Sequence, residues 1–155
     1  MSDRVALVTG STSGIGAATA RRLARDGYKV ALHSRSSADA GTRMAGELEG
    51  ASYHQADLAD EQATRDLVAS VLKRHGRLDV LVNNAGQSMR IPHADLKAAT
   101  PAVWRHMLDV NLIAPFVLVT EAEPALLTST SRRPWRFRTD ATRSRVACSS
   151  ARSAW

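Results

Sequence analysis

The amino-acid sequence predicts an α/β protein with a doubly wound parallel sheet that stops after its fourth strand and a long helix. Over residues 1–130, four short apolar runs alternate with longer amphipathic stretches, which is the pattern of βα units around a parallel sheet. A glycine-rich turn follows the first apolar run, and one long apolar stretch closes this region. The 155 residues are enough for one domain with a buried core.

The expected elements follow in alternating order. Val5 to Val8 is a buried strand, and the helix after it, over 14–26, ends at Gly27. Further strands are expected at 29–34, 51–56 and 78–82, and further helices at 39–48, 60–75 and 100–127. In the last helix Thr100 is the N-cap and Pro101 takes the first helical position.

The last helix also carries two internal prolines and an unusual hydrophobic pattern. Pro115 and Pro124 are expected to disturb it, because proline cannot donate the helical hydrogen bond. Its residues are apolar nearly all round, which favours burial against a sheet or another subunit.

Residues 131–155 have a different composition. They hold seven arginines and one acid, Asp140, which accounts for the whole net charge of +6. They lack Leu, Ile, Gly, Lys and Glu, and no helical or strand period survives. We interpret them as an Arg/Ser-rich tail that is disordered and, as a hypothesis, translated out of frame. The charge therefore does not indicate a nucleic-acid partner for residues 1–130.

Several function classes are excluded at this stage. Cys148 is the only cysteine and the five histidines show no ligand spacing, so neither a disulfide nor a metal site is expected. No secretory signal pattern is present, and no apolar run is expected to reach membrane-spanning length. The sequence thus predicts a cytoplasmic protein without a membrane partner.

The turn after the first strand has the pattern of a phosphate-binding loop. Gly10 allows the tight turn, Gly14 lets the backbone approach a pyrophosphate, and Gly16 allows close packing of the following helix. The amides at the helix N-terminus then attract anions. A flexible loop is the alternative, but the position between a strand and a helix favours binding. The expected contacts come from Gly10, Ser11, Ser13, Gly14, Ile15 and Gly16.

The spacing Thr-Gly-x-x-x-Gly-x-Gly over residues 9–16 resembles the short-chain dehydrogenase/reductase family. Three further motifs of that family occur in order: Asp57-Leu58 after the third strand, Asn83-Asn84-Ala85-Gly86 after the fourth, and Asn111 in the long helix. The resemblance covers about residues 3–130. It implies that residues 1–130 form an incomplete Rossmann-like domain of an NAD(P)-dependent oxidoreductase acting on carbonyl or alcohol substrates.

The resemblance also implies roles for these residues. Asp57 and the Leu58 amide would hold the adenine, while Asn84, Ala85 and Gly86 would lie along the adenosine ribose and brace the sheet. Two alternatives remain open. Asn83 could be the amide that ties neighbouring strands, and Asp57 could be a helix N-cap.

The end of the second strand bears on the choice of cofactor. No acid lies between Lys29 and Ala38, so the carboxylate that usually binds the ribose 2′-hydroxyl of NAD is missing. Arg35 could instead bind a 2′-phosphate, with Ser34 and Ser36 as hydroxyl donors. We predict NADP(H) over NAD(H). A solvent-exposed arginine in a serine loop is the alternative.

The catalytic pattern of the family is incomplete in this chain. The resemblance implies a tyrosine as acid–base, a lysine four residues later, a serine and a long-helix asparagine. Asn111 matches the asparagine, although it could instead mend the helix kink near Pro115. The only tyrosines are Tyr28 and Tyr53, and neither begins a Tyr-x-x-x-Lys motif.

Two functional hypotheses follow. The chain is an NADP(H)-dependent oxidoreductase of a small-molecule substrate, or it is an inactive truncated or frameshifted remnant that binds nucleotide weakly. The missing residues favour the second for this chain. The family is usually homo-oligomeric, but without later strands the fourth strand would be an open edge, so we do not expect a regular oligomer here.

Overall fold

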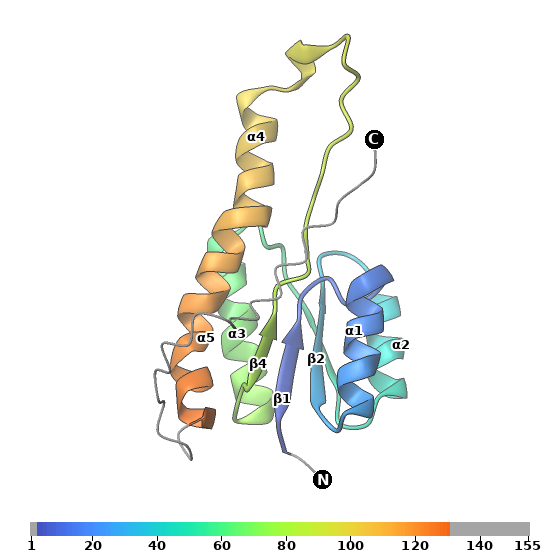
Figure 1. The fold of residues 1–155 in the computed structure, drawn as a ribbon, viewed down its shortest axis with the longest axis vertical. Helices are drawn as coiled ribbons and strands as arrows, with labels where there is room; N and C mark the ends of the chain where they lie inside the picture. Colours follow the sequence, from blue (N-terminus) through green and yellow to red (C-terminus); the bar gives the residue numbers. More distant parts are fainter. Residues whose placement is uncertain (1–2, 131–155) are drawn as a thin grey trace, which may run out of the picture.

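The computed structural model describes residues 3–130, which form a four-stranded parallel sheet. Its strands are β1 (Val5–Val8), β2 (Lys29–Ser34), β3 (Ser52–Gln55) and β4 (Val80–Val82). They lie in the order β3-β2-β1-β4, as the sequence predicted (Figure 1). Among the described residues β4 pairs only with β1, so it is an edge strand.

Helices cover both faces of this sheet (Figure 1). The helices are α1 (Gly14–Arg25), α2 (Ala38–Glu47), α3 (Glu61–His75), α4 (Pro101–Leu108) and α5 (Ala114–Thr130). Side chains of β1 point alternately to the two faces of the sheet. Val5 and Leu7 pack toward α3 and α5, whereas Val8 packs toward α1. A short 3₁₀-helix, Leu96–Ala98, was not predicted from the sequence.

The helix ends follow the capping signals of the sequence. Asp60 caps α3 by accepting from the Ala63 amide at 3.0 Å, and Gly76 ends it in the left-handed conformation at φ 74°. Thr100 accepts from the Val103 amide at 3.4 Å, with Pro101 in the first turn of α4. Most predicted boundaries therefore shift by only one or two residues.

The long helix is interrupted once. A π-helical turn, Asp109–Ile113, separates α4 from α5 and lies directly before Pro115. Since Pro115 has no N–H, the helical pattern must be re-formed here, and the Ala114 amide bonds to the carbonyl of Asp109. Pro124 lies inside α5 without ending it. The disturbance predicted at Pro115 is present, and the one predicted at Pro124 is wrong.

The long helix is also less buried than its composition suggested. Ala114, Leu118 and Ala122 pack in the core, whereas Phe116 is 67% exposed. Other apolar side chains exposed on the same helical stretch are Trp104, Leu108, Leu112, Ile113, Val119 and Leu127. The expectation of burial is met on one face only.

The stretch Pro101–Thr128 is long and apolar enough to cross a membrane, with a mean hydropathy of 1.5 in its most apolar window. The expectation that no segment reaches that length was therefore wrong. Length and composition are weak arguments for a membrane span, since core helices of soluble proteins meet the same criteria.

A chain of serines and histidines joins β3 to α3. Ser70 Oγ donates to the Leu67 carbonyl at 2.7 Å, so it must accept from His54 Nδ1, also at 2.7 Å. In neutral His54 the Nε2 atom then accepts from Ser52 Oγ at 2.8 Å, and His75 Nε2 donates to that oxygen at 2.7 Å. With His54 uncharged, every hydrogen bond of this network has one donor and one acceptor.

This network makes the stability of the fold dependent on pH. Burial, followed by the charges of His75, His33 and Arg74, lowers the pKa of His54 from 6.5 to about 4. The unfolded chain therefore takes up this proton first as the pH falls, so stability present above pH 6.5 is lost between about 6.5 and 4.

We expect the melting temperature to fall over that pH range and His54→Asn to flatten the fall. Burial also lowers the pKa of His33 and His75, so part of the slope should remain. Thermal unfolding followed by circular dichroism at each pH would measure this. His93→Asn, in the exposed loop before α4, is the matched control, and equal slopes in His54→Asn and the unmutated chain would contradict the assignment.

Candidate functional site

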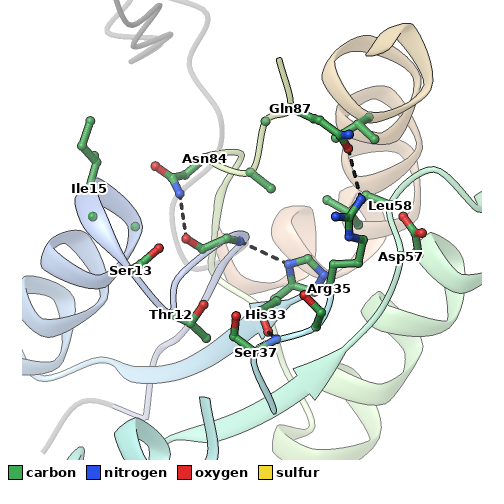
Figure 2. A pocket seen from close by; sticks show the side chains of 18 residues that line it. Thr12, Ser13, Ile15, His33, Arg35, Ser37, Asp57, Leu58, Asn84 and Gln87 are labelled. Carbon is green, nitrogen blue, oxygen red and sulfur yellow. Dashed lines mark hydrogen bonds between the residues drawn. The ribbon is translucent and has the colours of Figure 1, made fainter. Parts of the chain in front are cut away.

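A cavity of about 780 Å³ opens at the carboxyl ends of the strands, where the loops after all four strands meet (Figure 2). Thirteen of the residues expected to bind cofactor line it: Gly10, Ser13, Gly14, Ile15, Gly16, Ser34, Arg35, Ser36, Asp57, Leu58, Asn84, Ala85 and Gly86. Thr12, His33, Ser37, Gln87 and Val110 also line it and were not expected. Ligands of parallel α/β sheets bind at this end.

The turn between β1 and α1 suits an anion. Gly10 and Gly14 have φ of 62° and 53°, a conformation that other residues rarely adopt. The Ser13 side chain makes no capping bond to α1, and the first turn of that helix has no acidic residue. The amides at this helix end therefore remain available to a phosphate.

Gly16 allows the close packing of α1, as the sequence indicated, and the structure shows which atoms this helix approaches. A Cβ atom at this position would lie 2.2 Å from the Gly10 carbonyl oxygen and 2.4 Å from Asn84 Nδ2. The absence of a side chain thus lets α1 approach the turn and the β4 loop, rather than the strand itself.

The Asn84 amide braces β1 against the loop after β4 (Figure 2). Its Nδ2 atom donates to the carbonyls of Thr9 and Gly10 at 2.9 and 3.1 Å. The Thr9 hydroxyl accepts in turn from the amides of Asn84 and Ala85, both at 3.0 Å. Asn83 is exposed, and the tie between β1 and the β4 loop comes from Asn84.

Ser11 does not lie in the cavity wall. Its side chain is buried and its hydroxyl accepts from the His33 amide at 2.8 Å. The expectation that Ser11 contacts the cofactor is corrected: it fixes the turn to β2 because the chain bends inward at this position.

His33 is a site residue that the sequence reading missed. It is buried, its Nδ1 accepts from the Gly10 amide at 3.2 Å, and its Nε2 lies 3.1 Å from the Ala56 carbonyl, to which it donates (Figure 2). Burial lowers its pKa, which keeps the ring neutral with the proton on Nε2. The sequence carried a signal for it, since a single histidine stands next to the last residue of the apolar run of β2.

Arg35 reaches across the cavity from the loop after β2. Its Nη1 donates to Gln87 Oε1 at 3.2 Å (Figure 2). His106 Nε2 lies 3.0 Å from the same oxygen. The guanidinium is therefore held by a neutral amide rather than by a carboxylate. Arg35 is exposed, as the alternative expected, and it also lines the cavity.

Asp57 lies at the far wall, directly after β3 and Ala56. Its Oδ1 accepts from the Ala59 amide at 3.0 Å, while Asp60 caps the following helix. The alternative that Asp57 is the N-cap was wrong, and Asp57 lines the cavity. Leu58 beside it is buried.

Asn111 lies in the π-helical turn and does not line the cavity. Its Oδ1 accepts from the Gln87 amide at 2.8 Å and its Nδ2 donates to the Gln87 carbonyl at 2.7 Å. It thus holds the loop after β4, beside Gly86, and does not mend the helix backbone near Pro115.

The described part of the cavity wall contains neither tyrosine nor lysine. The Tyr53 hydroxyl lies 2.8 Å from Ser34 Oγ, and the Tyr28 ring lies under the Arg4 guanidinium at 4.3 Å. Over residues 3–130, no group of three acidic, histidine or cysteine side chains could hold a metal ion.

The sheet order and the anion-binding turn define a Rossmann-like α/β protein. The family model described as short chain dehydrogenase matches residues 4–133, and the chain belongs to this family. The resemblance found in the sequence is confirmed.

Among curated proteins, the putative ketoacyl reductase 2 of the granaticin polyketide synthase from Streptomyces violaceoruber is 50% identical over 125 residues, covering 81% of this chain and 50% of that protein. The putative ketoacyl reductase of the monensin polyketide synthase from Streptomyces virginiae is 44% identical, covering 74% and 44%. The chain spans about half the length of the curated relatives it matches.

Solved structures give the same result for the fold. A short chain dehydrogenase from Burkholderia cenocepacia in complex with NADP is 39% identical, with a TM-score of 0.74 over 80% of this chain and 51% of that one. A blue fluorescent protein from a metagenomic library in complex with NADPH is 36% identical, with a TM-score of 0.72 over 79% and 51%.

Proposed function

We propose that this chain binds NADP(H) in the cavity and corresponds to the nucleotide-binding part of a carbonyl/alcohol oxidoreductase. The observation that carries the proposal is Arg35, which enters the cavity at the ribose end without an acid beside it on the β2 loop. A carboxylate there would repel a 2′-phosphate, whereas a guanidinium binds one. Binding of NADP and NADPH by two structural neighbours supports this choice.

The residues present fit the dinucleotide along its whole adenosine half. The open amides at the start of α1, next to Gly14, would hold the pyrophosphate, and Asp57 with the Leu58 amide would hold the adenine. Asn84, Ala85 and Gly86 would lie along the ribose. Arg35 would have to exchange Gln87 for the 2′-phosphate, which is possible because Gln87 is a neutral partner.

Bound NADP(H) would supply or accept the hydride of the reaction. The chain itself would bind and orient the adenosine half, while Asn111 would hold the loop of Gln87 at the other end of the cavity. The described cavity wall contains no tyrosine or lysine to take the roles of the family's acid–base pair. We therefore propose that the 155 residues alone bind nucleotide without completing catalysis.

The substrate class rests on the relatives. Two Streptomyces relatives are putative ketoacyl reductases, so a ketoacyl group is the first class to test in a protein that combines this region with a catalytic half.

A cytoplasmic location stays a prediction.

Arg35→Ala should weaken NADPH binding about tenfold or more and leave NADH binding nearly unchanged. A charge-assisted hydrogen bond contributes about 1.5–3 kcal/mol, and only NADPH carries the 2′-phosphate. Titration of cofactor fluorescence would measure both affinities. Arg43→Ala, an exposed arginine on α2, is the matched control. Equal affinities for NADPH and NADH in the unmutated chain would rule out the assignment.

A further inference from the structure

Two side chains of β3 hold the loop that carries Arg35. This loop, residues 34–37, connects β2 to α2 and lines the cavity at the ribose end. The Tyr53 hydroxyl lies 2.8 Å from Ser34 Oγ, and Gln55 Nε2 donates to the Arg35 carbonyl at 2.9 Å. Neither Tyr53 nor Gln55 lines the cavity, so both act on the loop and not on a ligand.

The Tyr53 ring packs closely against α2. A Cβ atom at Gly41 would lie 2.2 Å from two carbons of the ring, so the helix backbone packs directly on its face. The ring also belongs to the core cluster that includes Leu32 and Met44. Because the ring packs against α2 and this cluster, its hydroxyl is held in place beside Ser34.

The Ser34 hydroxyl connects the two ends of the loop. Besides Tyr53, it bonds to the amide of Ser37, at 3.1 Å, and Ser37 is the N-cap of α2. Ser34 is itself 94% buried, since only 6% of it is exposed. Its expected role as a direct phosphate donor is therefore secondary to closing the loop.

We propose that Tyr53 and Gln55 are positioning residues for 2′-phosphate recognition, because they hold the backbone of residues 34–37 in the shape that aims Arg35 into the cavity. This inference rests on the proposed NADP(H) preference. Arg35 has a long, flexible side chain, and binding is weakened whenever the loop must be ordered at the moment of binding. A loop ordered in advance by β3 removes that cost for a ligand with a 2′-phosphate.

The two ligands that test this differ only in that phosphate: adenosine 2′,5′-bisphosphate and adenosine 5′-monophosphate. Calorimetric titration of the full 155-residue chain with each gives a ratio of affinities. We expect Tyr53→Phe and Gln55→Met each to lower this ratio about three- to tenfold, the effect of one lost hydrogen bond. The affinity for the monophosphate should change by less than twofold.

Matched controls separate positioning from general damage. Tyr28→Phe removes the other tyrosine hydroxyl, and Gln62→Met changes an exposed glutamine on α3. Both should keep the ratio of the unmutated chain. Gln55 is exposed, so Gln55→Met tests the inference even if Tyr53→Phe fails to fold.

The possible results distinguish the positioning role of Tyr53 and Gln55 from the proposed NADP(H) preference on which it rests. If the unmutated chain binds both ligands equally, the NADP(H) preference and the inference fail together. If the chain prefers the bisphosphate and Arg35→Ala removes the preference, but Tyr53→Phe and Gln55→Met keep it within twofold, the positioning role alone is overturned. Loss of the preference in all three variants supports it.

Discussion

Gly16→Ala is expected to weaken dinucleotide binding about 10- to 100-fold and to lower the stability of the fold by about 1–3 kcal/mol. The added methyl group would lie 2.2 Å from the Gly10 carbonyl oxygen and 2.4 Å from Asn84 Nδ2. The first is backbone, and the second is held by two hydrogen bonds, so neither can move without cost. The turn must shift, and with it the amides that face the phosphate.

Gly46→Ala provides the control for this prediction. Gly46 lies in α2, and a Cβ atom there would meet nothing within 4 Å. Alanine in a helix is favoured over glycine by about 0.5–1 kcal/mol, so this variant should melt slightly higher and bind normally. Cofactor fluorescence and thermal unfolding would measure both variants. Binding by Gly16→Ala within twofold of the unmutated chain would show that the turn tolerates the methyl group.

Much of the fold could be predicted because its signals are local. The buried run of β1, the glycine turn and the capping residues Asp60, Gly76 and Thr100 each act within a few residues of the chain. Strand order followed from the family resemblance. The position of the cavity could be predicted as well, since the glycine turn and the other family motifs lie in the loops that line it.

The remaining features depend on contacts between distant residues. The His33 ring joins Gly10 to Ala56, and Arg35 meets Gln87 across 52 positions of sequence. Ser11 was misplaced for the same reason, since only the path of the chain shows that its hydroxyl turns toward β2. Motif spacing identifies the loop but not which of its side chains faces the ligand.

The long helix illustrates a second limit. Composition alone cannot tell a helix buried on all sides from one that packs on one face and leaves Phe116 and Leu112 exposed. The two prolines likewise look equivalent in sequence. Pro115, which has no backbone N–H to donate, comes shortly after a π-helical turn. Pro124 lies inside α5, which continues without a break.

We also expect the 155-residue chain, purified as it stands, to turn over no aldehyde, ketone or secondary alcohol at a measurable rate. Loss of the acid–base group alone costs about 10²–10⁴-fold in rate. The two tyrosines are already engaged, Tyr53 with Ser34 and Tyr28 with Arg4. The last lysine of the chain, Lys97, lies exposed in the short 3₁₀-helix before α4.

A panel of carbonyl and alcohol substrates, followed by NADPH absorbance, would measure this prediction. Gly14→Asp is the informative variant, because it places a carboxylate at the phosphate cradle and adds a side chain where φ is 53°. Activity that survives purification but disappears in Gly14→Asp would come from this cavity and would contradict the prediction. Activity that persists in Gly14→Asp would come from a contaminant.

Nucleotide binding without turnover is the expected result, because the residues that bind the adenosine half and those that move the proton lie on different parts of the family's chain.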